Sequence, residues 1–169
     1  MDTQEMMEVY KKLGTPGPKH KLLAGMEGSW KAKIKSWMEP GKPPMESSGT
    51  SENNMILGGR FLQQDFSAEM MGSPFSGLGI SGYDNNIKKF VSTWIDSMGT
   101  GILFFEGAVG ADPKAIIEES QYNDPIKGPM KWRSITRVAD ENSYEFVLLT
   151  VDKTGTEEKM MEIDYTRKR

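Results

Sequence analysis

The sequence predicts an all-β protein: an up-and-down antiparallel β-barrel of about ten strands, with a short N-terminal helical segment packed near one end. Three observations predict this fold. Apolar and polar residues alternate along much of the chain from Gly28 onward, as in strands with one buried face. Turn-forming residues recur at steps of roughly 13 to 15 residues. No stretch between them is long enough for a helical crossover, so neighbouring strands must pair antiparallel.

The first 27 residues are predicted to be helical. In residues 3–13, Met6, Tyr10 and Leu13 recur at helical spacing, and Gly14 followed by Pro16 ends the pattern. A second short helix is expected over residues 19–24. Because helices of this length are not stable alone, we expect both to pack on the rest of the protein. Residues 1–27 and 28–169 are therefore treated as a helical segment and a barrel within one domain.

The strands follow from residue 28 to the end of the chain. Trp30, Ala32 and Ile34 alternate with lysines in the first strand, and a proline-rich loop over residues 39–44 follows it. Gly77 and Gly79 lie inside a strand pattern, where glycine indicates a bend or a close approach. A long meander of this kind curls, and closing it removes the exposed edges. The later turns are marked by Gly58-Gly59, Gly72-Ser73-Pro74, Asp84-Asn85-Asn86, Ser97-Met98-Gly99, Ala111-Asp112-Pro113, Asn123 to Pro129, Asp140-Glu141-Asn142 and Lys153-Thr154-Gly155.

Composition argues against several function classes. The net charge is −3, from 21 basic and 24 acidic residues, so we expect no nucleic-acid partner. No apolar run approaches the roughly 20 residues of a membrane-spanning helix. The N-terminus lacks the pattern of a signal peptide, and the chain has no cysteine for disulfides or thiolate sites. We therefore expect a cytoplasmic protein.

A set of short motifs resembles known barrel proteins. Gly28-Ser29-Trp30, on the first strand after a helical turn, resembles the lipocalin and fatty-acid-binding-protein (calycin) superfamily. A longer ordered set is similar to an uncharacterised bacterial domain family with a lipocalin-like barrel, and it spans nearly the whole chain. The resemblance implies a fold and carries no activity. The motifs are His20-x-x-Leu23, Gly28-x-Trp30, Gly58-Gly59-Arg60-Phe61-Leu62, Pro74-Phe75-x-Gly77, Gly82-Tyr83-Asp84, Trp94-x-Asp96-Ser97-x-Gly99 and Tyr165-x-Arg167.

The resemblance also implies roles for two residues and argues against a haem. Calycins often place a basic residue from a late strand over the tryptophan, and Arg167 over Trp30 would close one end of the barrel. Nitrobindin-like ten-stranded barrels, which are similar in shape, hold haem on a histidine late in the chain. The one histidine here, His20, precedes the first strand. We therefore expect no haem or other cofactor, and no motif predicts a metal site.

Six residues are candidates for lining a ligand cavity, because the interior of a barrel of about ten strands can leave room for a small molecule. Trp94 and Asp96 share a strand face that mixes aromatic, hydroxyl and acidic groups. A part-buried Arg60 would need a carboxylate, and Asp96 is a candidate partner, although Asp96 could instead bond the following turn. Tyr83 and Tyr165 would bring phenols inside. Arg133 is expected on the solvent face, but turned inward it would make an anion-binding barrel.

These residues support three hypotheses of function. The first is a non-enzymatic carrier or sensor that holds a small apolar or amphipathic molecule inside the barrel. The second is a cavity enzyme, an isomerase or hydrolase that uses Asp96 with Tyr83 or Tyr165, which would require a raised carboxylate pKa. The third is a protein-interaction module or homodimer that uses the outer barrel face. The sequence leaves the ligand and the oligomeric state open, including a homo-oligomer.

Overall fold

A computed structural model describes residues 2–169 and confirms the predicted fold class. Ten antiparallel strands follow two helices and close into one barrel, in which each strand pairs with its neighbours in sequence and β1 pairs with β10. The elements are α1 (Thr3–Leu13), α2 (Pro18–Ala24), β1 (Gly28–Ser36), β2 (Met45–Ile56), β3 (Phe61–Met70), β4 (Ser73–Asp84), β5 (Lys89–Asp96), β6 (Leu103–Val109), β7 (Ala115–Asp124), β8 (Gly128–Asp140), β9 (Ser143–Val151) and β10 (Glu157–Arg167).

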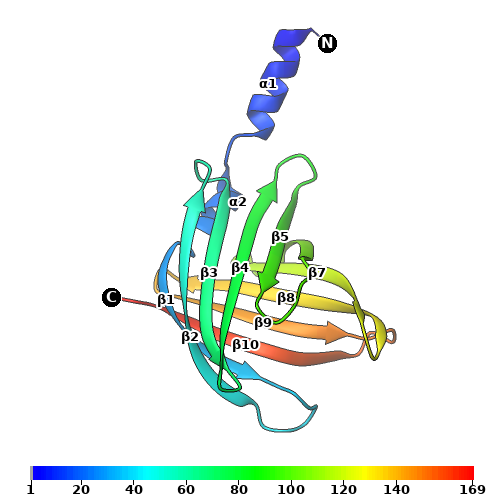
Figure 1. Ribbon diagram of the computed structural model, residues 1–169. Coiled ribbons are helices and arrows are strands. Elements are labelled where there is room, and N and C mark those ends of the chain that lie inside the picture. The colour runs from blue at the N-terminus through cyan, green and yellow to red at the C-terminus, as the bar shows by residue number, and fades with distance from the viewer. Residues whose placement is uncertain (1) are drawn as a thin grey trace.

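The strands cross steeply from one side of the barrel to the other. Figure 1 shows β2 to β5 running upright in front of β7 to β10, which lie nearly across them. Such tilt is what closure of a twisted sheet requires. The barrel therefore has two ends: one near the start of β1, covered by α2, and one near the start of β2, where the turns leave an opening.

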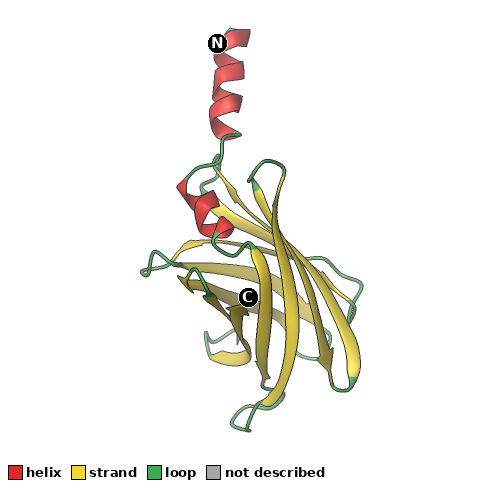
Figure 2. Cartoon of the chain, turned by 90° about the vertical axis from the view of Figure 1, so that its left-hand side faces the viewer, coloured by secondary structure: helices red, strands yellow, loops and turns green. Residues whose placement is uncertain are grey.

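The two helices differ in how they meet the barrel. In α2, His20 and Leu23 are buried, and His20 Nδ1 accepts a hydrogen bond from the Gly17 N–H at the start of the helix. The expected packing therefore holds for α2. In contrast, α1 has no buried residue, although Asp2 and Glu5 form a capping box that supports its first turn. Figures 1 and 2 show α1 projecting away from the barrel.

Two barrel turns hold the base of the projecting helix. Asn85, in the β4–β5 turn, donates hydrogen bonds from Nδ2 to the carbonyls of Leu13 (2.8 Å) and Thr15 (2.9 Å). Arg60, at the start of β3, donates from Nε to the Gly14 carbonyl at 2.9 Å. These bonds tie the segment between α1 and α2 to the barrel while the body of α1 stays exposed.

The end beneath α2 is sealed around Trp30. The indole is fully buried, donates from Nε1 to the Met26 carbonyl, and has the Arg167 guanidinium 4.2 Å from its ring centre. Arg167 also donates to the carbonyls of Glu141 (2.7 Å) and Glu27 (2.6 Å). A planar group with several fixed donors suits this position, because it spans three segments and stacks on an aromatic ring at once.

The barrel wall is incomplete on one side. β6 pairs with β7 only between Glu106–Val109 and Ile116–Glu119, whereas β7 pairs with β8 along its whole length. The two strands therefore part toward the open end. Separately, no helix within residues 2–169 has the length and apolar character to cross a membrane.

Candidate functional site

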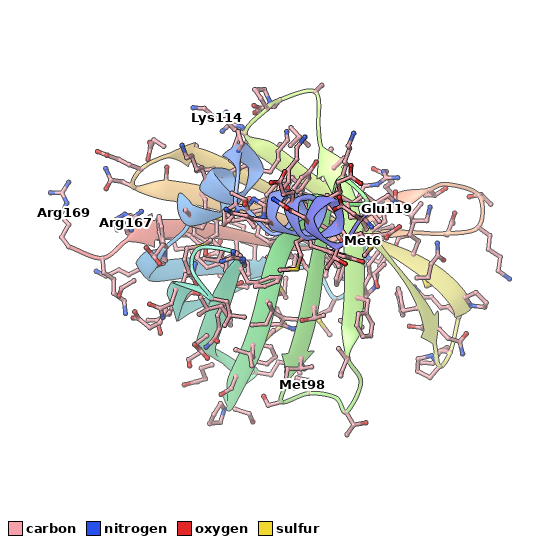
Figure 3. All side chains as sticks on the ribbon, turned by 90° about the horizontal axis from the view of Figure 1, so that it is seen from above. Met6, Met98, Lys114, Glu119, Arg167 and Arg169 are labelled. Atoms are coloured by element: carbon pink, nitrogen blue, oxygen red, sulfur yellow. The ribbon has the colours of Figure 1, made fainter. Side chains whose placement is uncertain are left out.

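A cavity of about 310 Å³ lies inside the barrel and extends toward the open end. Its wall is mainly aromatic, aliphatic and methionine side chains, with polar groups in a few places. Met98, on the loop that follows β5 (labelled in Figure 3), lies at the rim and is exposed, whereas Ile34 and Phe66 are buried deeper in the wall. Cavities of this size and character are typical of small-molecule sites.

Trp94 lies against β4, and two glycines make room for it. A Cβ atom added at Gly77 would lie 2.2 Å from Trp94 Cζ2, and one added at Gly79 would lie 3.1 Å from Cε3. These two glycines therefore permit the close approach that their place in a strand predicted. The Trp94 indole then donates from Nε1 to Asp96 Oδ2 at 2.8 Å.

Asp96 bonds the turn that follows β5, which was one of the two roles expected for it. Its Oδ1 accepts from the backbone N–H of Met98 at 2.9 Å, while its Oδ2 holds Trp94. The side chain still lines the cavity near the rim. Asp96 thus fixes the Trp94 ring, and it leaves one carboxylate at the mouth of the cavity.

Glu118, on β7, is a second carboxyl group in the cavity wall and is only 7% exposed. The Ser92 hydroxyl, from β5, lies 2.9 Å from both carboxyl oxygens and 3.1 Å from the Ser81 hydroxyl of β4. Burial raises the pKa of Glu118 to about 7, and the hydrogen bond from Ser92 acts in the opposite direction. Near neutral pH this group therefore exists in both charged and protonated forms.

A network of hydrogen bonds lines the deep end of the cavity. Asn53 donates from Nδ2 to the Met26 carbonyl (2.9 Å) and to the Tyr144 hydroxyl (3.0 Å), and its Oδ1 accepts from Ser51. Gln64 donates to Ser51 and to the Tyr165 hydroxyl, which links the two tyrosines through the network. Burial raises the pKa values of both tyrosines, so their phenols stay neutral. Because its members bond one another, this end is a fixed polar floor.

An aromatic group covers the region where β6 and β7 part. Phe105 and Trp132 stack with ring centres 6.5 Å apart, and Tyr122 lies 4.4 Å from Trp132. Among residues 2–169, Trp132 Nε1 is the buried side-chain polar atom without a hydrogen-bond partner. An unpaired buried donor is costly, and this indole lines the cavity, so its N–H is a polar group that the barrel itself leaves unsatisfied.

The structure separates the six residues that the sequence placed in a cavity. Trp94, Asp96 and Tyr165 line it. Tyr83 packs instead beneath α2, against His20 and Phe90. Neither tyrosine is hydrogen-bonded to Asp96 in the described part of the chain, since Tyr165 bonds Gln64.

The two arginines also lie elsewhere. Arg60 is exposed and holds the α1–α2 segment, so the candidate pairing of Arg60 with Asp96 is wrong: the two lie at opposite ends of the barrel. Arg133 faces outward and pairs with Glu119 at 2.9 Å and with Glu157. The alternative of an inward, anion-binding Arg133 is therefore wrong as well, and the solvent-facing interpretation holds.

Sequence reasoning missed Glu118 and Asn53. Glu118 alternates with Ile116 and Ser120 on one strand face, but Ile117 and Glu119 on the other face look much the same. Asn53 lies in a strand of mostly polar residues whose register the sequence leaves open. A polar residue between apolar ones on a single strand face was the available signal, and it was weak. Within residues 2–169, no cluster of three or more acidic or histidine side chains is suited to a metal ion.

Comparison with known proteins supports the fold and adds a family. A protein of Mycobacterium tuberculosis, whose crystal structure is described as that of Rv2717c, superposes with a TM-score of 0.65 at 15% identity, covering 92% of this chain and 100% of that one. A redesigned β-barrel matches at 13% identity with a TM-score of 0.47, over 88% of this chain and 96% of the design. No protein of curated function matches the chain. The family model described as "Protein of unknown function (DUF1579)" matches residues 15–167, and the chain therefore belongs to this family.

Proposed function

We propose that this protein binds a small amphipathic molecule inside its barrel and acts as a carrier or sensor, not as an enzyme. The observation that carries the proposal is the cavity of about 310 Å³, with an apolar wall and polar groups at separate places. At about 30 Å³ for each water-sized group, this volume suits a ligand of roughly ten non-hydrogen atoms. Burying the apolar part of such a molecule would supply most of its affinity.

The geometry gives less support to a cavity enzyme built on Asp96. Both Asp96 oxygens already accept hydrogen bonds, from the Trp94 indole and the Met98 backbone. A general base must reach the proton that it removes, whereas Tyr83 packs against Phe90 beneath α2 and the Tyr165 hydroxyl bonds Gln64. We therefore assign Asp96 to holding Trp94 in place.

The binding proposal is tested with a matched pair of variants on β6. Leu103 lines the cavity, whereas its neighbour Phe104 faces outward and is 63% exposed. Leu103→Trp fills the cavity and should weaken binding of octan-1-ol, measured by isothermal titration calorimetry, at least tenfold. Phe104→Trp should leave it unchanged. Equal effects of the two substitutions, or no binding by the unmodified protein, would contradict the proposal.

The natural ligand can be sought directly. Native mass spectrometry of the protein purified from its own host should show a mass above that of the chain, and the mass should return to that of the chain after organic extraction. The Leu103→Trp variant from the same host serves as the control and should carry less of the added mass. A barrel that always emerges empty would count against a carrier or sensor role.

One observation favours a second candidate function, self-association through α1. Met6, Val9 and Tyr10 form an apolar face on α1 and are 42%, 45% and 72% exposed. A helix of this length is marginal in water without a partner. The same chain exposes Val91, Ile95 and Phe104 on the outer face of β5 and β6. Two copies could cover both surfaces at once in a two-fold arrangement, which is why a second copy is the occupant that we propose.

Sedimentation velocity tests this second candidate. The full chain should sediment as a dimer at high concentration, and Val9→Lys should shift it toward the monomer because it places a charge on the apolar face. Gln4→Lys adds the same charge to the opposite side of the helix and should have no effect. A monomer at every concentration would exclude self-association.

A further inference from the structure

The charged groups of the cavity have one sign. Among the described residues, the lining side chains include the carboxyl groups of Glu118 and Asp96 and no lysine, arginine or histidine. On β8, Lys131 and Arg133 flank Trp132, and both pair with Glu119 on the outer face of the barrel. A ligand with an anionic head group would therefore find no cation inside the barrel to pair with its charge, and burying an unpaired charge is unfavourable.

Glu118 has hydrogen-bonding capacity to spare. A carboxylate can accept about four hydrogen bonds. The Ser92 hydroxyl carries one proton and can fill one of these positions, although it lies 2.9 Å from both oxygens. Asp96, in contrast, is engaged by two N–H donors. Of the two cavity carboxylates, Glu118 is the one that can receive several donors from a ligand.

Aromatic rings lie on the same stretch of wall as Glu118. In the register of the sheet, Glu118 pairs with Ser134 and Ser120 pairs with Trp132, so Trp132 lies one step diagonally from Glu118 on the inner face. On the other side, Glu118 pairs with Gly107, two residues beyond Phe105 on β6. Phe105 and Trp132 stack on each other. A carboxylate beside aromatic rings is the combination that recognises ammonium groups, through ion pairing and cation–π attraction.

We propose that the cavity selects an amphiphile with a primary ammonium head group, bound by Glu118 beside Phe105 and Trp132. Its apolar tail would extend along the apolar wall toward Phe66 and Trp94, whose ring centres are 6.3 Å apart. This inference rests on the proposed ligand-binding function and adds the chemical class of the ligand. The ammonium supplies up to three donors to the free positions of Glu118.

Three probes of equal chain length separate an ammonium, a hydroxyl and a carboxylate head group: octylamine, octan-1-ol and octanoate. At pH 8 the amine is charged, since alkyl ammonium groups such as that of lysine have a pKa of about 10.4, and Glu118 is mostly ionised. By isothermal titration calorimetry, octylamine should bind about tenfold or more tightly than octan-1-ol, because a hydrogen bond between charged groups is worth at least that ratio. Octanoate should bind more weakly than the alcohol.

Two variants test whether Glu118 is the source of the preference for octylamine. Glu118→Gln keeps the shape of the side chain and should bring octylamine to the affinity of octan-1-ol, with little change for the alcohol. Glu119→Gln alters the adjacent, outward-facing residue and should leave all three affinities as they are. The alcohol serves as a fold control in each variant, because its binding needs an intact cavity.

The outcomes distinguish this inference from the function on which it rests. If octylamine and octan-1-ol bind the unmodified protein equally, or if Glu118→Gln keeps the preference, the ammonium site is refuted while the binding function stands. If octanoate binds tightest, the assigned class is also refuted. If none of the three probes binds, the inference and the proposed function fail together.

Discussion

The Ser92 hydroxyl lies 2.9 Å from both carboxyl oxygens of Glu118, so that β5 and β7 are joined inside the barrel across the intervening β6. The link sits near the point at which β6 stops pairing with β7. A buried carboxyl group at the place where the wall parts combines a structural tie with a chemically distinctive group in the cavity.

The pH dependence of stability should carry the signature of Glu118. Its pKa is about 7 in the folded protein and about 4.5 when unfolded, so folding favours the protonated form. The contribution of protonated Glu118 to the stability of the folded protein is fully present below pH 4.5 and is lost as the pH rises through 7. Relative to Glu118→Gln, the wild type should lose about 3 kcal/mol of unfolding free energy over this range.

Urea denaturation at several pH values measures this difference. The carboxyl groups whose pKa values are lowered, such as those of Glu119 and Glu162, lose their stabilising effect only at lower pH and act in the opposite direction. Glu119→Gln is the matched control and should follow the wild type between pH 5 and 8. If the unfolding free energies of the wild type and of Glu118→Gln changed with pH in parallel, Glu118 would have an ordinary pKa in the folded protein.

The glycine beneath Trp94 should be intolerant of a side chain. In Gly77→Ala, the new Cβ would fall 2.2 Å from Trp94 Cζ2, so the ring that donates to Asp96 must move. We expect a loss of about 1 to 3 kcal/mol in unfolding free energy. Gly99→Ala is the control, since nothing lies within 4 Å of a Cβ at that position. An unchanged denaturation midpoint for Gly77→Ala would mean that the Trp94 ring is not held there.

The polar floor of the cavity should depend on Asn53. Asn53→Ala removes the donor to the Met26 carbonyl and the Tyr144 hydroxyl, and it removes the acceptor of the buried Ser51 hydroxyl proton, while Ser51 still accepts from Gln64. The expected cost is about 2 to 4 kcal/mol, measured by urea denaturation. Asn54→Ala, at the next and exposed position, should cost less than about 0.5 kcal/mol. Similar costs for the two changes would argue that the network adds no stability.

The closed end of the barrel should distinguish arginine from lysine. Arg167→Lys keeps the charge but loses the planar group that lies over Trp30 and donates to the carbonyls of Glu27 and Glu141. We expect a loss of about 1 to 2 kcal/mol and a changed near-ultraviolet circular dichroism signal from Trp30. The conservative change Arg169→Lys, at the chain end, should alter neither quantity. Full stability in Arg167→Lys would show that charge alone suffices.

Much of the fold was predictable because it follows from local patterns. Trp30, Ala32 and Ile34 alternate with lysines, and Asp84-Asn85-Asn86 marks a turn between two strands, so strand order and antiparallel pairing follow from sequence. The predicted proline-rich loop falls between β1 and β2, and the tight approach at Gly77 and Gly79 is that of Trp94. These features depend on residues close together in the chain.

The candidate site depends on residues far apart in the chain, and only the tertiary structure brings them together. Alternation along a strand gives a period of two but not which face turns inward, since Ile116 and Glu118 on one face resemble Ile117 and Glu119 on the other. An inner face that lines a cavity can hold polar groups, so hydrophobicity does not identify it. Closure of the barrel decided that Glu118 points in and Arg133 points out. It also placed Ser92 beside a carboxyl group 26 residues away in sequence.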